Sequence, residues 1–359
     1  MLRRLTLASA VALAASTLMM APPAAAATQL QVYGAWLCGT DECTWATVPN
    51  MTTFDADNHW LINRGDGIAS VNLVVLAFVN PLKLLDQTTD SGDVGGVPAG
   101  MTSTVVNYFT SHGVRVMLSV GGVTYTGDWD TALSQNPAQL GLNAAAAARQ
   151  LGVGIEIDYE NSSSPNLTGL QSFIDAYRSQ LPYDASGSNP AARLTIDLAA
   201  GDQYLTALDR YATQNWLTTS NPVLDYANAM VANKQLTASN QEKQWLEHAD
   251  GEPQYSPPVP PLAPAKFTGS VYIAGTSQVL PECDDFAASL EDSTGSFVQD
   301  VAPDGAGSTS GMLGYMFWAA GQPSTRGVST FPPNTCQGGV GIGSSTYSVP
   351  VPMAPLPQS

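Results

Sequence analysis

Short apolar runs rich in β-branched residues recur along the whole chain, separated by stretches with helical spacing or loop composition. Several runs, such as residues 74–78 (VVLAF), are apolar without a break, which indicates strands buried on both faces. Strands that alternate with helices favour a parallel sheet, and eight such repeats in about 290 residues favour a closed barrel over an open sheet. We therefore predict an α/β fold, a (β/α)8 TIM barrel in a single domain.

The predicted elements follow from these runs and from the spacing between them. The strands are residues 31–36, 71–79, 114–120, 152–159, 194–198, 223–230, 267–274 and 312–318. The helices are residues 104–112, 137–150, 167–180, 203–217 and 286–292, and a capping box at residues 239–242 (SNQE) predicts one more.

Residues 1–27 have the order of a secretory signal, with Arg3-Arg4, then an apolar stretch, then small residues. A membrane anchor is the alternative, but the apolar run is short for a span. We expect a secreted, extracellular protein whose barrel domain covers residues 28–348. The proline-rich tail at residues 349–359 is expected to be poorly ordered.

The chain carries 30 acidic and 13 basic residues, a formal net charge of −17. This charge disfavours nucleic acid and anionic membranes as partners and suits a protein that acts on an uncharged substrate. The three histidines, His59, His112 and His248, are isolated and lack the spacing of a zinc site. We expect no metal, no cofactor and a monomer.

Four cysteines, Cys38, Cys43, Cys283 and Cys336, occur in a chain that the leader marks for export. An oxidising compartment favours disulfides over metal ligands. Three pairings are possible. We favour Cys38 with Cys43 and Cys283 with Cys336, because each pair would pin a loop.

Three acids, Glu156, Asp158 and Glu160, alternate with apolar residues in a chain that is only 12% charged. A strand places alternate side chains on one face about 6.6 Å apart, so the three carboxyls converge on one small volume. Like charges this close resist simultaneous ionisation, which favours one protonated carboxyl, a candidate general acid. A solvated edge strand is the alternative. Glu160 ends the fourth predicted strand, where barrel enzymes carry their catalytic residues.

At this point the chain resembles glycoside hydrolase family 18, the chitinases and their relatives. Residues 153–160 (VGIEIDYE) are similar to the fourth-strand pattern DGxDxDxE of that family. Residues 117–122 (MLSVGG) are similar to its third-strand motif SxGG, and residues 314–318 (GYMFW) to its eighth strand, which ends in tryptophan. The resemblance spans most of the chain after the leader and implies a TIM-barrel glycosidase.

The resemblance also implies roles for individual residues. Glu160 would protonate the glycosidic oxygen, while Asp158 would orient the N-acetyl group of the substrate, whose carbonyl oxygen is the nucleophile; such substrate-assisted chemistry is an exception to the two-carboxylate scheme. Glu156 would tune how the proton is shared. Further candidates for the substrate site and its support are Trp318 as an apolar floor under the sugar, Tyr33 and Ser119 as hydrogen-bonding supports, and Gly121, Gly122, Met230 and Asn233.

The sequence also departs from the family pattern. Val153 replaces the first acid of the fourth-strand motif and Glu156 the second, so we expect a rearranged buried relay. Residues 225–233 (DYANAMVAN) place Ala232 where relatives carry a tyrosine, for which Asn228 or Asn233 would partly substitute. Five aromatic residues near predicted loops either continue a sugar-stacking path or simply pack: Trp36, Trp60, Tyr125, Trp129 and Tyr204.

Three classes of function remain open. The first is a secreted retaining hydrolase of β-1,4-linked N-acetylglucosamine polymers, chitin or chitooligosaccharides, or an endo-β-N-acetylglucosaminidase that cuts N-glycan cores. The second is a chitinase-like lectin or inhibitor with little or no turnover. The third is an unrelated barrel whose acids bind Ca²⁺ or Mg²⁺.

Overall fold

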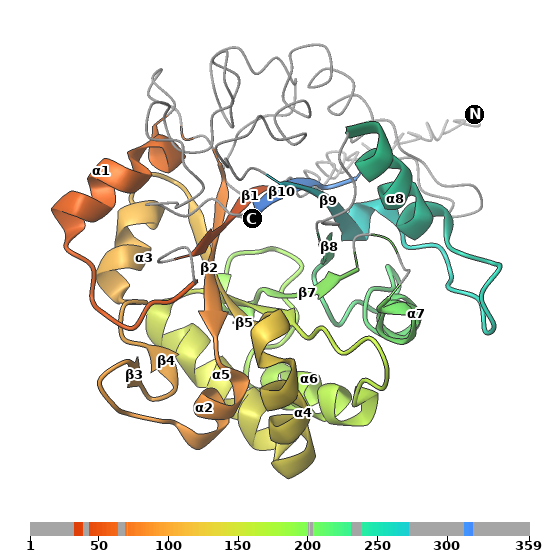
Figure 1. Cartoon of the computed structure of the whole chain (residues 1–359), viewed down its shortest axis with the longest axis horizontal. Coiled ribbons are helices and arrows are strands. Elements are labelled where there is room, and N and C mark those ends of the chain that lie inside the picture. The colour runs from red at the N-terminus through yellow and green to blue at the C-terminus, as the bar shows by residue number, and fades with distance from the viewer. Residues whose placement is uncertain are drawn as a thin grey trace, which may run out of the picture.

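The computed structural model of the chain describes residues 32–38, 43–63, 69, 71–199, 201, 204–230, 238–272 and 312–318. Eight parallel strands close into one barrel, in the order β1-β10-β9-β8-β7-β6-β5-β2, because β1 pairs with both β2 and β10 (Figure 1). The barrel strands are β1 (Val32–Cys38), β2 (Leu73–Val79), β5 (Arg115–Gly121), β6 (Gly154–Asp158), β7 (Leu194–Leu198), β8 (Ala227–Ala229), β9 (Phe267–Tyr272) and β10 (Gly314–Trp318). A hairpin of β3 (Asp93–Val94) and β4 (Val97–Pro98) stands apart from it.

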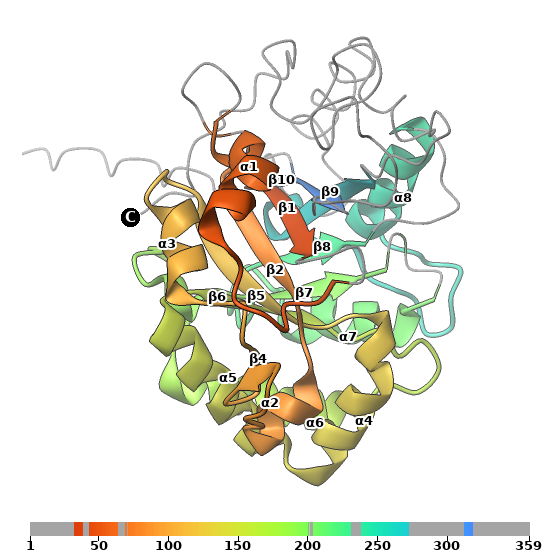
Figure 2. The same ribbon diagram turned by 60° about the vertical axis from the view of Figure 1, so that its left-hand side comes forward.

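Helices surround the strands, as the two ribbon views show (Figures 1 and 2). They are α1 (Met51–Ile62), α2 (Pro81–Asp86), α3 (Ser103–Thr110), α4 (Thr126–Gln135), α5 (Pro137–Leu151), α6 (Leu167–Gln180), α7 (Thr206–Asn215) and α8 (Ala238–Asp250). The predicted (β/α)8 barrel is confirmed, and each of the eight predicted strands overlaps a barrel strand. Three helices, α1, α2 and α4, were not among the sequence predictions, and the predicted helix at residues 286–292 lies outside the described residues.

Two separate apolar cores hold the barrel. The larger one lies between the strands and the helices, and it takes the outward-facing strand residues such as Val74 and Leu76. The smaller one fills the barrel interior with alternate residues of the same strands, including Leu73, Val75 and Met316. Alternate residues of a strand point to opposite faces, so β1, β2, β5 and β10 supply the strand residues of the inner core.

The barrel interior also has a polar side, made by strands β5 to β9. Its buried polar residues are Ser119, Glu156, Asp158, Thr195, Asp197, Asn228, Thr268 and Ser270. The strand register places these residues at neighbouring levels, for example Ser119 beside Glu156 and Asp197 beside Asn228. Buried polar groups of this kind need hydrogen-bond partners, so this side of the barrel depends on hydrogen bonds as well as on packing.

Helix caps fix where the outer elements begin and end. Asn80 accepts hydrogen bonds from the first amides of α2, and Pro81 opens that helix. Asn136 and Pro137 begin α5 in the same way. Gly152 ends α5 with a φ of +70°, a left-handed conformation that favours glycine, and β6 starts two residues later at Gly154. The entry into the acid-bearing strand is therefore set by a helix stop.

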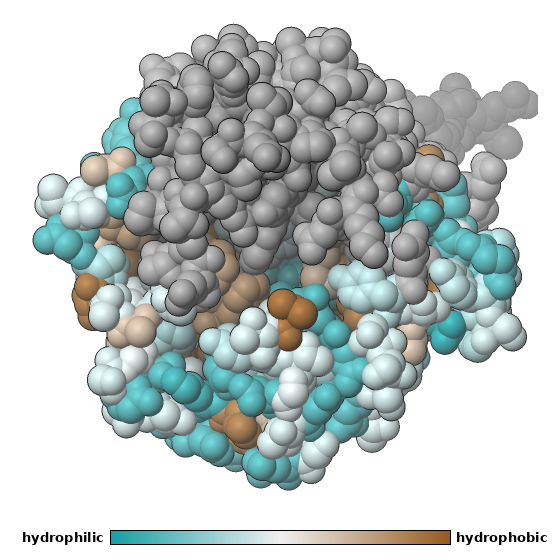
Figure 3. All heavy atoms as spheres, in the orientation of Figure 1, coloured by the Kyte–Doolittle hydropathy of each residue, from teal (hydrophilic) through white to brown (hydrophobic). Residues whose placement is uncertain are grey.

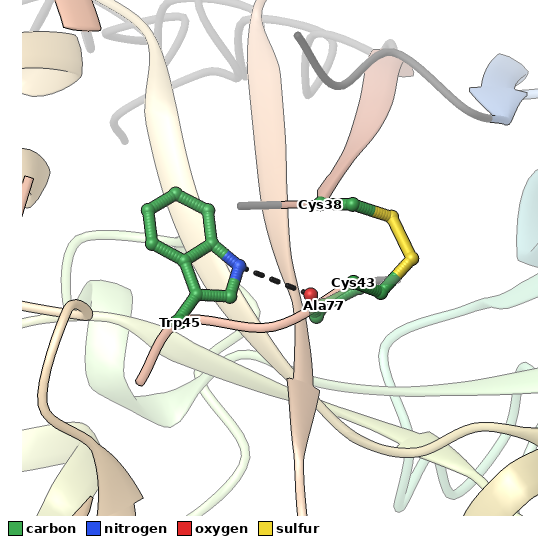
Figure 4. The surroundings of a disulfide bond; sticks show 4 residues. All are labelled: Cys38, Cys43, Trp45 and Ala77. Atoms are coloured by element: carbon green, nitrogen blue, oxygen red, sulfur yellow. Dashed lines mark hydrogen bonds between the residues drawn. A yellow bond between two sulfur atoms is a disulfide. The ribbon is translucent and has the colours of Figure 1, made fainter. Parts of the chain in front are cut away.

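The disulfide between Cys38 and Cys43 confirms one of the two expected pairs (Figure 4). It closes a short loop after β1. Nearby, the Trp45 indole donates a hydrogen bond of 3.0 Å to the carbonyl of Ala77 on β2. These two links tie the chain that follows β1 to the neighbouring strand. Cys283 and Cys336 lie outside the described residues.

The described surface carries few large apolar side chains. On the face seen in Figure 3, hydrophilic and intermediate colours cover most of the described residues. The exposed large apolar residues are Val48, Val94, Val123 and Tyr204. Among the described helices, none combines the length and the apolar character that crossing a membrane requires. The leader at residues 1–27 and the tail at residues 349–359 lie outside the described residues.

A buried charge network closes the N-terminal end of the barrel. Asp225, just before β8, is 5% exposed and accepts hydrogen bonds from Arg193 Nη1 at 3.0 Å, Arg178 Nη2 at 3.2 Å and the Leu194 amide at 2.8 Å. Lys266 Nζ donates to the Asp225 carbonyl at 2.9 Å. Asp225 thus joins α6 and β7 through its carboxylate and the segment before β9 through its backbone carbonyl.

Asp225→Ala should lower the free energy of unfolding by about 3–5 kcal/mol, because it leaves two guanidinium groups buried without their carboxylate. Urea denaturation followed by tryptophan fluorescence measures this change. The matched control is Asp175→Ala on the exposed face of α6, which should cost less than about 0.5 kcal/mol. Equal effects of the two substitutions would contradict the assigned role of Asp225.

Candidate active site at the carboxyl ends of the strands

The three alternating acids lie inside the barrel. Glu156 and Asp158 are 0% and 4% exposed, and Glu160, just beyond the end of β6, is partly buried. Ile155, Ile157 and Tyr159 belong to the outer core, so the predicted division of the two faces is confirmed. The edge-strand alternative is wrong, because β6 pairs with β5 on one side and β7 on the other.

Glu156 is held by donors from opposite sides of the barrel. Trp36 on β1 donates through Nε1 to Oε1 at 2.8 Å, and Asn228 on β8 donates through Nδ2 to Oε2 at 2.7 Å. Thr268 on β9 donates to Asn228 Oδ1 at 2.6 Å, which fixes the orientation of that amide. Trp36 is therefore a buried partner of the acid and not an exposed sugar platform, and buried Asn228 does not substitute for the missing tyrosine.

A fourth carboxyl, Asp197 on β7, joins the group and was missed by sequence reasoning. It is 2% exposed and hydrogen-bonds Glu156. Burial, followed by the charges of Glu156 and Asp158, raises the pKa of Asp197 well above its ordinary value. The available signal was its position in LTIDL, two residues after Thr195 on the inward face, but a single acid in a short strand predicts nothing by itself.

Asp158 lies between the charges of Glu156 and Glu160. Burial and then the charges of Glu160 and Glu156 raise the pKa of Asp158 well above its ordinary value. Its Oδ1 is buried without a hydrogen-bond partner. Ser119 on β5 lies beside Glu156 on β6 in the strand register. It lowers the pKa of Glu156, although its hydroxyl is not aligned for a regular hydrogen bond. Asp158 thus keeps one carboxyl oxygen uncommitted.

The glycine pair after β5 lets the backbone pass closely over Asp158. Gly121 has a φ of +126°, and a Cβ there would lie 1.8 Å from the Asp158 carbonyl oxygen. Gly122 has a φ of +87°, and its amide donates to the same carbonyl at 3.0 Å. Trp129 Nε1 also donates to that oxygen, at 3.0 Å. Both glycines are therefore backbone requirements of the turn that carries the chain past the acids.

That turn brings a backbone donor to Glu160. The amide of Val123, directly after the glycine pair, hydrogen-bonds the Glu160 carboxyl. This bond lowers the pKa of Glu160, but the larger effect of burial raises it overall. The protonated form of Glu160 is thus favoured at higher pH than for a glutamate in water.

Residues on both sides of Glu160 are clamped to α4. The Tyr159 hydroxyl donates to Asp130 and accepts from the Asn166 amide at 2.9 Å. Asn161 Nδ2 donates to both carboxylate oxygens of Asp130 at 3.0 Å. Asp130 therefore fixes the backbone on either side of the candidate acid, a role that sequence reasoning missed.

Tyr204 lies at the open side of the acid group, in the turn after β7. It is 41% exposed, and its hydroxyl lies 3.9 Å from Met230 Sδ. Burial, then the charges of Glu160 and Asp158, raise the pKa of the Tyr204 phenol, so it stays a hydrogen-bond donor. Of the four aromatic residues expected near the loops whose side chains are described, Trp36, Tyr125, Trp129 and Tyr204, only Tyr204 fits a rim position by both exposure and charge. Trp129 is fully buried and packs on Tyr159 and Phe173.

The structure does not describe the side chains of several predicted site residues. The side chains of Tyr33, Trp60 and Trp318 and the whole of Ala232 and Asn233 lie outside the described part of the chain. Their expected roles stay predictions. Val153 is described, and its side chain lies in the outer core, away from the relay inside the barrel. The expectation that Val153 disturbs the relay is therefore wrong, because that position faces the helices.

Among the described residues, no group of three histidine, cysteine, aspartate or glutamate side chains is arranged to hold a metal ion. Glu156 instead points both of its oxygens at Trp36 and Asn228. A carboxylate that accepts two such bonds is committed to protein donors, and the group as a whole is suited to storing and moving a proton.

The four buried carboxyls predict how stability depends on pH. The folded state raises the pKa of Glu156, Asp158, Glu160 and Asp197, so it binds more protons than the unfolded chain above about pH 4. Their stabilising contribution is complete below the unfolded pKa values and is lost as pH rises through the folded ones.

Asp158→Asn removes one of these groups. The quantity to follow is the free energy of unfolding of the wild type minus that of Asp158→Asn. This difference should fall by more than about 1 kcal/mol between pH 4.5 and 7.5. Urea titrations at four pH values measure the difference. Asp175→Asn, on the exposed face of α6, should show no such trend against the wild type. A difference for Asp158→Asn that stays flat or grows with pH would refute the assigned shifts.

No protein-family model and no curated protein matches the chain. Among solved structures, the chain is similar to a GH18 chitinase from Pseudoalteromonas aurantia (15% identity, TM-score 0.48, covering 80% of this chain and 94% of that chain). A chitinase from Bacteroides thetaiotaomicron has 16% identity and a TM-score of 0.44, covering 69% of each chain. A GH18 chitinase from Cycas revoluta, in complex with allosamidin, has 13% identity and a TM-score of 0.45, covering 68% of this chain and 69% of that chain. These are solved structures to which the chain is similar, whereas its barrel is established by its own strand pairing.

Proposed function

We propose that this chain is a secreted glycoside hydrolase that cleaves β-1,4-linked N-acetylglucosamine polymers, with Glu160 as the general acid and base. The observation that carries the proposal is the pairing of a partly buried glutamate with a fully buried aspartate at the carboxyl ends of barrel strands. Burial keeps Glu160 protonated beyond the range of an ordinary glutamate, which is what a glycosidase acid needs. Chitin and chitooligosaccharides are the substrates of first choice.

The placement of the two carboxyls on one strand bears on the mechanism. Most glycosidases set two carboxyls on either side of the scissile bond, one as acid and one as base or nucleophile. Asp158 and Glu160 instead project from the same face of one segment, and Asp158 is the deeper of the two. Asp158 is thus poorly placed to attack from the opposite face of the sugar. The acetamido group of the substrate is the nucleophile that this geometry favours.

The proposed reaction has two steps. Glu160 gives its proton to the glycosidic oxygen while the acetamido carbonyl oxygen bonds to the anomeric carbon, and the leaving sugar departs with that proton. The resulting oxazolinium ion is positive, and the carboxyl of Asp158 stabilises it in a site with little water. Glu160, now ionised, takes a proton from water as the water oxygen bonds to the anomeric carbon and the bond from that carbon to the acetamido oxygen breaks. The sugar configuration is retained and Glu160 regains its proton.

The charge of the chain supports an uncharged substrate. A net charge of −17 and four acids in one site would repel a polyanion. N-acetylglucosamine units are neutral and present both an apolar C–H face and an amide. An exported protein also suits a polymeric substrate that lies outside the cell. A cut inside the chitobiose core of N-glycans would use the same groups.

A sugar-binding protein without turnover is the second candidate. Ala232 supports it, because it stands where the resembling family carries a tyrosine that donates to the N-acetyl group. Loss of one preorganised donor costs about 10²–10³-fold in rate. Tight binding of N-acetylglucosamine oligomers in calorimetry, with no product after long incubation, would favour this candidate over the hydrolase.

Glu160→Gln should lower kcat on a reporter-linked N-acetylchitooligosaccharide by at least about 10²-fold, because the amide cannot deliver the proton. The matched control is Glu252→Gln. Glu252 precedes β9, at the other end of the barrel, and is nearly buried, so its substitution should leave kcat within about twofold. Parallel assays on an N-glycan core distinguish the two substrate classes. Undiminished activity of Glu160→Gln would exclude Glu160 as the acid.

Tyr204→Phe should lower kcat at least about tenfold, since it removes a phenol donor at the open side of Glu160 and Asp158. Steady-state kinetics on the same reporter measure this loss. Tyr211→Phe is the control, because Tyr211 lies on α7 with its ring against Trp216, outside the barrel. If Tyr204→Phe behaves like Tyr211→Phe, Tyr204 does not contact the reacting groups.

A further inference from the structure

Asp197 is a buried carboxyl that the proposed reaction does not use. It lies on the inward face of β7, beside Asn228 in the register of β7 with β8. It contacts the same Glu156 carboxyl that Asn228 and Trp36 contact. Its Oδ1 is buried without a hydrogen-bond partner. A buried acid in such a position costs folding free energy unless it stays neutral.

The direction of the hydrogen bond between the two carboxyls follows from their neighbours. Two carboxyls share a hydrogen bond only when one of them keeps its proton. The Trp36 indole N–H is a donor only, and Thr268 holds the Asn228 amide so that its Nδ2 faces Glu156. Both oxygens of Glu156 therefore already act as acceptors. The proton belongs to Asp197, which donates to a charged Glu156.

We propose that Asp197 is a positioning residue for the reaction: as the proton-bearing partner, it holds the negative charge of the cluster on Glu156, next to Asp158 on the same face of β6. The proposal rests on the proposed function and concerns how its acids share charge. With Glu156 charged, Asp158 keeps its proton through the cycle, and the negative charge on Glu156 behind it helps to stabilise the positive oxazolinium ion as that ion develops. Asp197 acts through Glu156 and Asp158 and does not touch the substrate.

In the described part of the barrel, the other titratable groups around Asp197 come from β6 and its end and from segments next to β7 and β8. Asp158 and Glu160 come from β6 and its end, Tyr204 from the turn after β7, and Tyr226 from the residue before β8. The buried interior residues of β9, Thr268 and Ser270, are uncharged. The largest effects on the pKa of Asp197 come from burial, Glu156, Asp158 and Asn228, and none of these residues is a cation. The charge on Glu156 is met directly by the hydrogen-bond donors Trp36 and Asn228.

Two substitutions at this position separate the donor role from mere packing. Asp197→Asn keeps a donor toward Glu156, so kcat should stay within about threefold and the pH profile should keep its alkaline limb. Asp197→Ala removes the donor, so Glu156 takes up a proton itself and the charge beside Asp158 is lost. For Asp197→Ala we expect kcat to fall at least about tenfold with KM changed less than about threefold, and the alkaline limb to move to lower pH, because Glu160 then has one negative neighbour fewer.

The measurement is kcat and KM from pH 4 to 9 on the N-acetylchitooligosaccharide reporter, with thermal unfolding of each variant. Asp184→Asn is the matched control, because Asp184 lies between α6 and β7 at the other end of the barrel. A purely structural Asp197 would lower stability without moving the limb. The proposal is overturned if Asp197→Ala keeps the wild-type limb, or if Asp197→Asn is as impaired as Asp197→Ala.

Failure of the proposed function is a separate result. It would show as wild-type protein that releases no reporter beyond the Glu160→Gln level. The charge assignment then still has a direct readout in infrared spectroscopy of the carboxyl groups. Wild-type protein at pH 7 should show absorption from protonated carboxyls, of which Asp197→Asn loses one component that Asp184→Asn retains. Unchanged absorption in Asp197→Asn would overturn the proposal whether or not the chain is a hydrolase.

Discussion

A charged carboxyl inside a β-barrel is tolerated only where donors from several strands reach it, and Glu156 is that carboxyl here. Trp36 approaches from β1, Asn228 from β8 and Asp197 from β7, while Thr268 of β9 orients Asn228. These strands are far apart in sequence and come together only because the barrel closes. The closed barrel and the polar interior therefore depend on each other: without closure, Glu156 would lose its partner on β1.

The same group of residues sets the character of the acids above it. Burial, followed by the charges of Glu160 and Glu156, opposes ionisation of Asp158, and burial opposes ionisation of Glu160. The turn at Gly121 and Gly122 adds one backbone donor to Glu160 and leaves its outer side open. Burial of the acids thus decreases along β6, from the enclosed Glu156 to the more accessible Glu160, and the proposed reaction depends on this difference.

Much of this arrangement could be predicted from local sequence, and the rest depends on contacts across the barrel. The alternation of acids with isoleucine predicts one strand with two faces, and the glycine pair predicts a close backbone approach. The function of Trp36 could not be predicted, because its partner lies 120 residues away on a strand that is not its neighbour. Asp197 and Asp130 were missed for the same reason. Helix α4 was missed because its buried residues, Trp129, Ala132 and Leu133, are few among polar ones.

The longer side chain at position 156 is best understood from what it reaches. Seen as a departure from the fourth-strand pattern, a glutamate in place of aspartate suggests a damaged relay. In the barrel, the extra methylene carries the carboxyl to donors on β1 and β8, and both of its oxygens are satisfied. Val153 packs outside the barrel and leaves this set untouched. The substitution therefore moves the buried charge toward the middle of the barrel, and the neutral Asp197 is the partner that this shift requires.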